Sequence, residues 1–402
     1  MGSLSKNPIG IEITDDIIKA VQLEKKRGQI KIFKLSQIAL VPGVIEHGRI
    51  KDEERLIEAF KELFLKAKPS PITEKKIVFG LPESQLYVHT FKLQSRKKKE
   101  RDNLVLKEIE ASIPLEKKDL LFSYKVMNKK KRKDKKTAIL LIATTREVVL
   151  EWQKLFQKLN LEVITFDVKS LAIFRALFPK KTEVPICTIN IGTTATDIAI
   201  FDGIGLHHSH TINIGGKDFT KAIAKELQIE FNQAEKKKQE VGLTDKSGSI
   251  FTVLDKILEP MTEEIKELFN YFKQTTQQEI KKIILVGGSS KLDGIVDYFN
   301  NHFGLTVKKA SLNLSEKEVP QEYIESFGLA LRNTNKTWIE DPSIPIEKYV
   351  LEQPSGGLTT NFPSSIANKK QAKKPQLNKI ILFAVLIISM ICLGVVYFYK
   401  YR

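Results

Sequence analysis

A run of 20 residues near the carboxyl end of the chain, Ile380 to Tyr399, contains no Asp, Glu, Lys or Arg. As an α-helix, this run would be about 30 Å long, which matches the hydrocarbon thickness of a bilayer. Five lysines lie between positions 369 and 379, whereas only Lys400 and Arg402 follow the run. Because positive charge favours the cytoplasmic side, the large amino-terminal part is expected in the cytoplasm. The sequence therefore predicts a single-pass protein of the inner membrane, with a buried core helix as the alternative.

The net charge of +17 includes two basic runs, at 96–99 and 129–136. Such runs are usually solvated loops, and contact with anionic lipid head groups is the alternative. Nucleic-acid binding is not predicted, because no aromatic residues alternate with the basic ones. The two cysteines, Cys187 and Cys392, give no disulfide framework and no metal-ligand spacing, which suits a reducing cytoplasm.

Hydrophobic patterns divide the rest of the chain into two halves of mixed strands and helices. The first half begins with strand-like runs at 9–13, 17–23 and 30–40. The second begins at 186–191 and includes a long helical stripe over 251–272, in which Pro260 is expected to kink or restart the helix. Residues 341–379 are polar and rich in proline and are predicted to be a linker.

Three short turns follow predicted strands: Thr14-Asp15-Asp16, Gly192-Thr193-Thr194 and Gly287-Gly288. Each turn alone is a weak signal. Together they fit an arrangement in which a hairpin from each half points backbone N–H groups at a phosphate chain. A Gly-Gly turn then lets the backbone approach a nucleoside. The alternative is that the glycines serve only tight turns.

With these turns, motifs spread over residues 8–332 resemble those of the actin-like ATPases, and among them the type IV pilus assembly protein PilM family, which is related to FtsA. The matching segments are a first phosphate hairpin at 9–23, an inserted subdomain at 108–126, a second phosphate hairpin at 190–201, connecting and base-side motifs at 214–220 and 234–238, an adenosine motif at 284–294 and a closing helix at 327–332.

The resemblance implies an α/β fold of the actin and hexokinase type with two lobes. The first lobe would span 8–180, with an inserted α+β subdomain at about 75–145, and the second would span 181–340. A linker at 341–379 and one transmembrane helix at 380–399 would follow.

The resemblance also implies a nucleotide between the lobes, with ATP and Mg²⁺ as the candidate cofactors. Lys19 would neutralise phosphate charge. The other implied contacts are Gly192, Thr193 and Thr194 to the phosphates, Gly215, Gly216, Glu235 and Lys238 to the ribose and base, and Gly287, Gly288 and Ser289 to the adenosine.

Two positions depart from the family where hydrolysis needs a carboxylate. The family's first hairpin reads Asp-Ile-Gly-Ser-Ser, whereas this chain reads Glu12-Ile-Thr-Asp-Asp16. Two like charges 4 Å apart at a dielectric of about 20 repel by about 4 kcal/mol, unless Mg²⁺ bridges them. Asn190 stands where the family has a second Asp, and Asn is a poor general base. Glu12 and Asn190 are the candidate catalytic positions, and the candidate metal positions through bound water. Hydrolysis is expected to be slow or absent.

His207, His208 and His210 lie close together in sequence, but no carboxylate or thiolate is expected beside them, so a metal site is not predicted.

PilM-like proteins are usually soluble and are recruited by a PilN tail, so a built-in anchor would be unusual. The predicted function is a membrane-tethered scaffold of a type IV pilus or related secretion or competence machine. PilN-like inner-membrane proteins, cytoplasmic pilus components and a second copy of the chain are the candidate partners. The characteristic Ile-Asn-Leu-Leu-Pro docking peptide is not found between 341 and 379.

Two other functions stay open. An active ATPase or sugar-kinase-type phosphotransferase would need a carboxylate base, and Asn190 argues against it. An FtsA-like polymerising division protein would be expected to have an amphipathic anchor, whereas 380–399 is apolar on every face.

Overall fold

The computed structural model describes residues 8–332, apart from 27–28, 95–97, 116–118, 128–136 and 315–316. Within these residues, no helix is long and apolar enough to cross a membrane. The predicted linker at 341–379 and the predicted transmembrane helix at 380–399 lie outside the described residues, as does the basic run at 129–136.

The amino-terminal half is built on a five-stranded sheet in the order β10-β6-β1-β2-β3. Strands β1 to β3 form an antiparallel meander, and β6 and β10 extend the sheet in parallel. The apolar alternation predicted from residue 9 onwards therefore forms strands, as expected. The strands are β1 (Ile9–Ile13), β2 (Ile17–Lys26), β3 (Gln29–Ala39), β6 (Lys76–Leu81) and β10 (Glu162–Val168).

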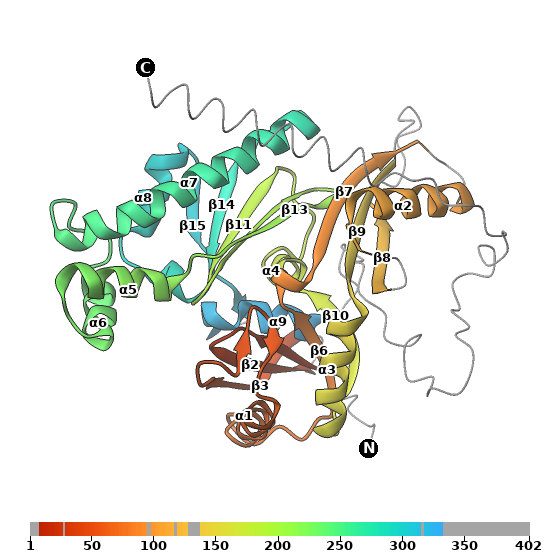
Figure 1. Cartoon of the computed structure of the whole chain (residues 1–402), viewed down its shortest axis with the longest axis horizontal. Helices are drawn as coiled ribbons and strands as arrows, with labels where there is room; N and C mark the ends of the chain where they lie inside the picture. The colour runs from red at the N-terminus through yellow and green to blue at the C-terminus, as the bar shows by residue number, and fades with distance from the viewer. Residues whose placement is uncertain are drawn as a thin grey trace, which may run out of the picture. The chain divides into compact units, whose positions relative to one another are not determined.

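Helices cover both faces of this sheet (Figure 1). On one face, Phe79 of β6 packs against Trp152, with ring centroids 4.6 Å apart, and an aromatic cluster forms around them. The helix α1 begins after Asp52, whose side chain accepts a hydrogen bond from the Arg55 amide. The helices are α1 (Glu53–Leu65) and α3 (Arg146–Lys158) on one face, and α4 (Lys169–Leu177) and α9 (Ile324–Leu331) on the other; a small hairpin of β4 (Ile45–Glu46) and β5 (Arg49–Ile50) precedes α1.

The second half repeats the same plan with a sheet in the order β13-β12-β11-β14-β15. Its long helix α7 runs without interruption through Pro260, so the helix does not restart at this residue, which was one of the two effects expected of the proline. The strands are β11 (Ile186–Ile191), β12 (Thr196–Asp202), β13 (Gly205–Ile212), β14 (Lys282–Val286) and β15 (Thr306–Lys309). The helices are α5 (Gly216–Leu227), α6 (Phe231–Val241), α7 (Ser249–Thr276) and α8 (Ile295–Phe303).

A third, smaller sheet, in the order β7-β9-β8, lies beside α2 (Figure 1). It comprises β7 (Tyr87–Leu93), β8 (Leu120–Val126) and β9 (Thr137–Thr145), and the helix is α2 (Lys98–Ser112). The sequence placed an inserted subdomain at about 75–145. In the structure β6, at 76–81, pairs with β1 and β10 in the first sheet, so the separate unit begins only at β7.

The two halves meet where α4 crosses α9. A Cβ atom on Gly328 of α9 would lie 1.9 Å from the Ala172 carbonyl oxygen of α4, so only glycine permits this approach. Arg175 of α4 donates to the Gly328 carbonyl oxygen at 2.8 Å and pairs with the buried carboxylate of Asp167. The crossing fixes the end of β10 and the start of α4 against β1, where the candidate site lies.

Candidate functional site

A cleft of about 1150 Å³ lies between the β1–β2 turn, the β11–β12 turn and the turn after β14. The predicted site residues that line it are Glu12, Lys19, Asn190, Gly192, Thr193, Thr194, Gly216, Glu235, Lys238, Gly287, Gly288 and Ser289. Gly215 is absent from the lining. Glu12 and Ser289, which are 277 positions apart in sequence, are thus brought to one cavity.

The first hairpin turn holds its acidic side chains by contacts with neighbouring elements. The Asp15 carboxylate accepts hydrogen bonds from the backbone amides of His47 and Gly48, at 3.0 and 3.1 Å. The Asp16 carboxylate lies 3.3 Å from the Lys217 ammonium of α5. The repulsion expected from two unpaired carboxylates is therefore reduced, because each is compensated within the protein. Asp15 is directed to the β4–β5 hairpin.

Glu12 and Lys19 are paired across the first hairpin, where they are register neighbours. Lys19 Nζ donates to Glu12 Oε1 at 2.6 Å, and both side chains are nearly buried. The other carboxylate oxygen, Glu12 Oε2, has no hydrogen-bond partner among the described atoms. Lys19 thus lines the cleft, and its ammonium group is already bound to one carboxylate.

A second lysine, Lys169, lies in the floor of the cleft, and the sequence did not point to it. It is the first residue of α4, directly after β10, and its Nζ donates to the Ile13 carbonyl oxygen at 2.6 Å. The Glu325 carboxylate is 3.6 Å away. Burial alone would lower the pKa of Lys169, but the charges of Glu325 and of neighbouring carboxyl groups outweigh burial and raise it. Lys169 therefore carries a positive charge inside the protein.

Three further carboxyl groups in the cleft were also missed by sequence reasoning: Glu83, Asp197 and Glu325. Burial, together with the charge of Asp197, raises the pKa of Glu83 to about 7. Burial, together with Glu12, raises the pKa of Glu325 to about 8. Burial also raises the pKa of Asp197, which accepts a hydrogen bond from Thr211 at 2.7 Å. Near neutral pH, the floor of the cleft therefore holds partly protonated carboxyl groups beside two ammonium groups.

The second hairpin turn is fastened to the start of α5. The backbone amides of Gly216 and Lys217 donate to the carbonyl oxygens of Gly192 and Thr193, at 2.9 and 2.8 Å. A Cβ on Gly215 would lie 2.5 Å from the Thr193 carbonyl oxygen. Gly215 thus allows α5 to approach the turn, and does not itself face the cavity. Thr193 is exposed at the tip of the turn, where a ligand could reach it.

The predicted base-side pair, Glu235 and Lys238 of α6, forms a closed network. The Lys238 ammonium donates to the Gly216 carbonyl oxygen, Thr220 Oγ1 and Glu235 Oε2, at 2.9, 2.8 and 2.7 Å. Burial opposes ionisation of Glu235, but the hydrogen bonds that its carboxylate accepts from Lys238, Thr220 and Gln239 lower its pKa. Two of the three acceptors of Lys238, in Gly216 and Thr220, belong to α5, so these hydrogen bonds hold α6 against α5.

The turn after β14 needs glycine and packs on Asn190. Gly287 has a φ of 88°, and a Cβ there would lie 2.5 Å from Asn190 Oδ1. A Cβ on Gly288 would meet nothing within 4 Å, which leaves its backbone open to the cleft. Ser289 Oγ lies 3.4 Å from the Gly192 carbonyl oxygen, so this turn and the second hairpin form one wall of the cleft.

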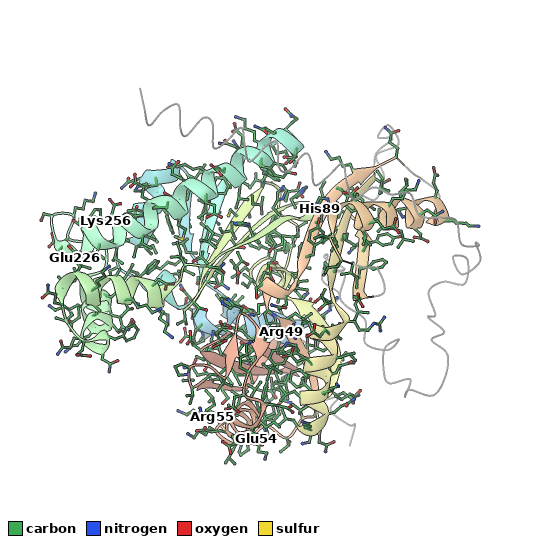
Figure 2. All side chains as sticks on the ribbon, viewed as in Figure 1. Arg49, Glu54, Arg55, His89, Glu226 and Lys256 are labelled. Atoms are coloured by element: carbon green, nitrogen blue, oxygen red, sulfur yellow. The ribbon has the colours of Figure 1, made fainter. Side chains whose placement is uncertain are left out.

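Two histidines of β13, His207 and His210, do have carboxylate neighbours, contrary to the expectation from sequence, and neither lines the cleft. His207 pairs with Asp202 at 2.9 Å, and His210 pairs with Glu264 at 2.6 Å. His89 of β7, labelled in Figure 2, pairs with Glu108 of α2 at 3.2 Å. No set of three or more His, Cys, Asp and Glu side chains in the described part of the chain is arranged to hold a metal ion.

A family model described as "Type IV pilus assembly protein PilM" matches residues 10–332. The chain belongs to this family. The PilM family match covers both sheets, the small β7-β9-β8 sheet and every residue that lines the cleft.

Solved structures with the same fold agree with this assignment. A chain of a PilM–PilN type IV pilus biogenesis complex has a TM-score of 0.70 and 20% identity, covering 82% of this chain and 99% of that one. MreB 5 of Spiroplasma citri bound to AMPPNP has a TM-score of 0.50 and 14% identity, covering 82% and 96%. The predicted mixed α/β actin-like fold is confirmed.

Among curated sequences, the cell division protein FtsA of Pseudomonas aeruginosa is 24% identical over 258 residues. The match covers 57% of this chain and 57% of FtsA. The chain therefore spans little more than half the length of this relative.

Proposed function

We propose that this chain is an actin-like scaffold of a type IV pilus assembly machine, whose folded body binds PilN-like inner-membrane proteins on the cytoplasmic side. The observation that carries the proposal is the PilM family match over residues 10–332. It is supported by the fold shared with nearly the whole of a chain from a PilM–PilN complex. The FtsA match covers a smaller part of both chains, which makes a division protein the weaker reading.

We also propose that residues 380–399 anchor the body to the inner membrane. The support is the uncharged run of 20 residues and the excess of lysines before it. A built-in anchor would hold the body near its membrane partners at all times, with the linker at 341–379 setting its reach.

Affinity capture tests the scaffold proposal. The full-length chain, tagged at its amino terminus, is purified from detergent-solubilised membranes of the cells in which it occurs, and the co-purifying proteins are identified by mass spectrometry. We expect a PilN-like membrane protein and other pilus assembly components, at levels above those of an unrelated tagged single-pass membrane protein. Recovery of division proteins with no pilus component would contradict the proposal and favour the FtsA-like function.

For the cleft, we propose ATP binding with little or no hydrolysis. The glycines at 192, 287 and 288 bring backbone to the cavity, and Lys19 supplies charge beside it. Asn190 has no carboxylate to accept a proton from water, and Glu12 is bound to Lys19. ATP would therefore act as a structural ligand of the folded body and not as a substrate.

Calorimetry with ATP, combined with phosphate release, tests the proposal for the cleft. We expect measurable binding of ATP. We expect phosphate release no greater than that in buffer without the protein. Turnover that is above this background and is abolished by Asn190→Ala would show an active ATPase instead.

A further inference from the structure

Two buried ammonium groups lie in the part of the cleft nearest β1. The side chains of Lys19 and Lys169 are only 11% and 6% exposed, respectively. They come from different elements, β2 and α4, and each has a fixed partner, Glu12 Oε1 for one and the Ile13 carbonyl oxygen for the other. The burial and the fixed partners make these lysines a built feature of the cavity.

The oxygen ligands around these lysines do not suit Mg²⁺. In proteins this ion keeps several water ligands and is held through one or two carboxylates together with the phosphates of the substrate. Glu12 has one oxygen bound to Lys19, and Asn190, at the other expected position, is a neutral amide packed on Gly287. Within the described ranges, no three acidic, His or Cys side chains converge on a common point. A divalent ion here would also lie beside two positive charges that are already present.

We infer that Lys19 and Lys169 take the place of Mg²⁺ in this cleft, so that it binds a nucleoside triphosphate without a divalent cation. The inference rests on the ATP binding proposed above and concerns its metal requirement. The ammonium groups are nearly buried and are held in place by their partners before the ligand arrives. They therefore offer the compensation of phosphate charge that a metal ion would otherwise bring.

The remaining charges of the floor are compatible with this role. Glu325 lies 3.6 Å from Lys169, and Glu83 and Asp197 complete the acidic set. Raised pKa values leave Glu83 and Glu325 largely or partly protonated near neutral pH, so that they cancel less of the lysine charge. With these two groups partly neutral, the floor repels a polyphosphate less than it would with all of its carboxylates ionised.

Calorimetry of ATP binding to the full-length chain, at neutral pH with either excess Mg²⁺ or excess EDTA, tests the inference. We expect dissociation constants that agree within about twofold in the two buffers. Lys169→Met removes the charge and is expected to weaken binding in EDTA by about tenfold or more, with part of the loss recovered in Mg²⁺. Lys169→Arg keeps the charge and is expected to bind more tightly than the Met variant.

Lys34→Met provides the matched control, because Lys34 is equally buried but lies outside the cleft and donates to the Pro71 carbonyl oxygen. It should bind ATP as the unaltered chain does in both buffers, and circular dichroism confirms that each variant is folded. Binding by the unaltered chain that is tenfold or more weaker in EDTA would overturn the inference and leave ATP binding intact. Unchanged EDTA binding by a folded Lys169→Met variant would also overturn it. No binding in either buffer would overturn ATP binding itself.

Discussion

The Glu325 carboxyl group is enclosed in the floor of the cleft, and burial and the charge of Glu12 raise its pKa from 4.5 to about 8. Its folded-state pKa exceeds its unfolded-state pKa, so the native state retains a proton that the unfolded chain releases. The free energy of unfolding should therefore fall as the pH rises from about 4.5 to about 8, by at most about 1.4 kcal/mol per pH unit from this one group.

Glu325→Gln removes this titration. We expect urea unfolding of the variant to depend less on pH between about 5 and 8, and its stability relative to the unaltered chain to increase towards alkaline pH. Glu226→Gln is the control, because Glu226 is exposed on α5 (Figure 2). If Glu325→Gln keeps the same pH slope as the unaltered chain, Glu325 is not the group that holds the proton.

At the level of single residues, sequence reasoning identified the cleft-lining residues that stand in short glycine turns. Gly192, Gly287 and Gly288 stand in turns that directly follow strands, and these turns can be read from a few consecutive residues. Lys169 could not be found in this way, because its contact with the Ile13 carbonyl spans 156 positions and depends on how α4 packs on the first sheet. Glu83 and Glu325 lie in no recognised motif, and only the fold brings them to the cleft.

Among the helices, the crossing of α4 and α9 depends on Gly328. A methyl group there would be 1.9 Å from the Ala172 carbonyl oxygen, so Gly328→Ala must separate two helices that support the site. We expect a loss of stability of about 1–3 kcal/mol, the usual cost of overpacking, measured by urea unfolding. Gly288→Ala is the matched control, since its Cβ would meet nothing within 4 Å. Equal stability of the two variants would show that the helices adjust without cost.

Elements with strong local periodicity could be predicted, whereas their pairing could not. The stripe over 251–272 lies in α7, and the apolar runs at 186–191 and 282–286 are β11 and β14. Pro260 was expected to kink or restart α7, but the helix is continuous through it, and the nearby Leu258 and Met261 are buried in the core. The pairing of β6 with β1, some 70 residues earlier in the chain, places β6 in the first sheet, and no local pattern in the sequence reveals such a pairing.

Across the whole body, the ion pair between Asp16 and Lys217 joins the first hairpin to the second half of the chain over 201 positions. Both side chains are partly exposed, so the pair contributes no more than about 1 kcal/mol to stability. Its effect on a ligand should be larger, because Asp16 places a negative charge in the cleft and occupies the Lys217 ammonium.

Asp16→Asn should therefore tighten ATP binding by roughly threefold to tenfold and change the free energy of unfolding by less than about 1 kcal/mol. Calorimetry and urea unfolding on the same preparation measure both quantities. The Lys217→Ala variant separates the effect of the Asp16 charge from the effect of a freed Lys217 ammonium. If the freed Lys217 contacts a phosphate in Asp16→Asn, then Lys217→Ala should bind ATP more weakly than Asp16→Asn does. Weaker binding by Asp16→Asn would instead mean that the ion pair organises the cleft for its ligand.

The proposed anchor makes a prediction for the complete chain in the cell. A chain ending at residue 340 keeps all the described elements and lacks the uncharged run, so it should appear in the soluble fraction, whereas the full chain should stay with membranes after a high-salt wash. Leu386→Arg is the sharper test, because an arginine near the centre of a membrane helix costs about 2.5–3.5 kcal/mol and leaves the basic residues unchanged. If the anchor holds the protein, this substitution should release part of it. If both altered chains stay with membranes until the salt wash, the basic surface or a membrane partner causes the membrane association instead. The scaffold would then be recruited to the membrane from solution.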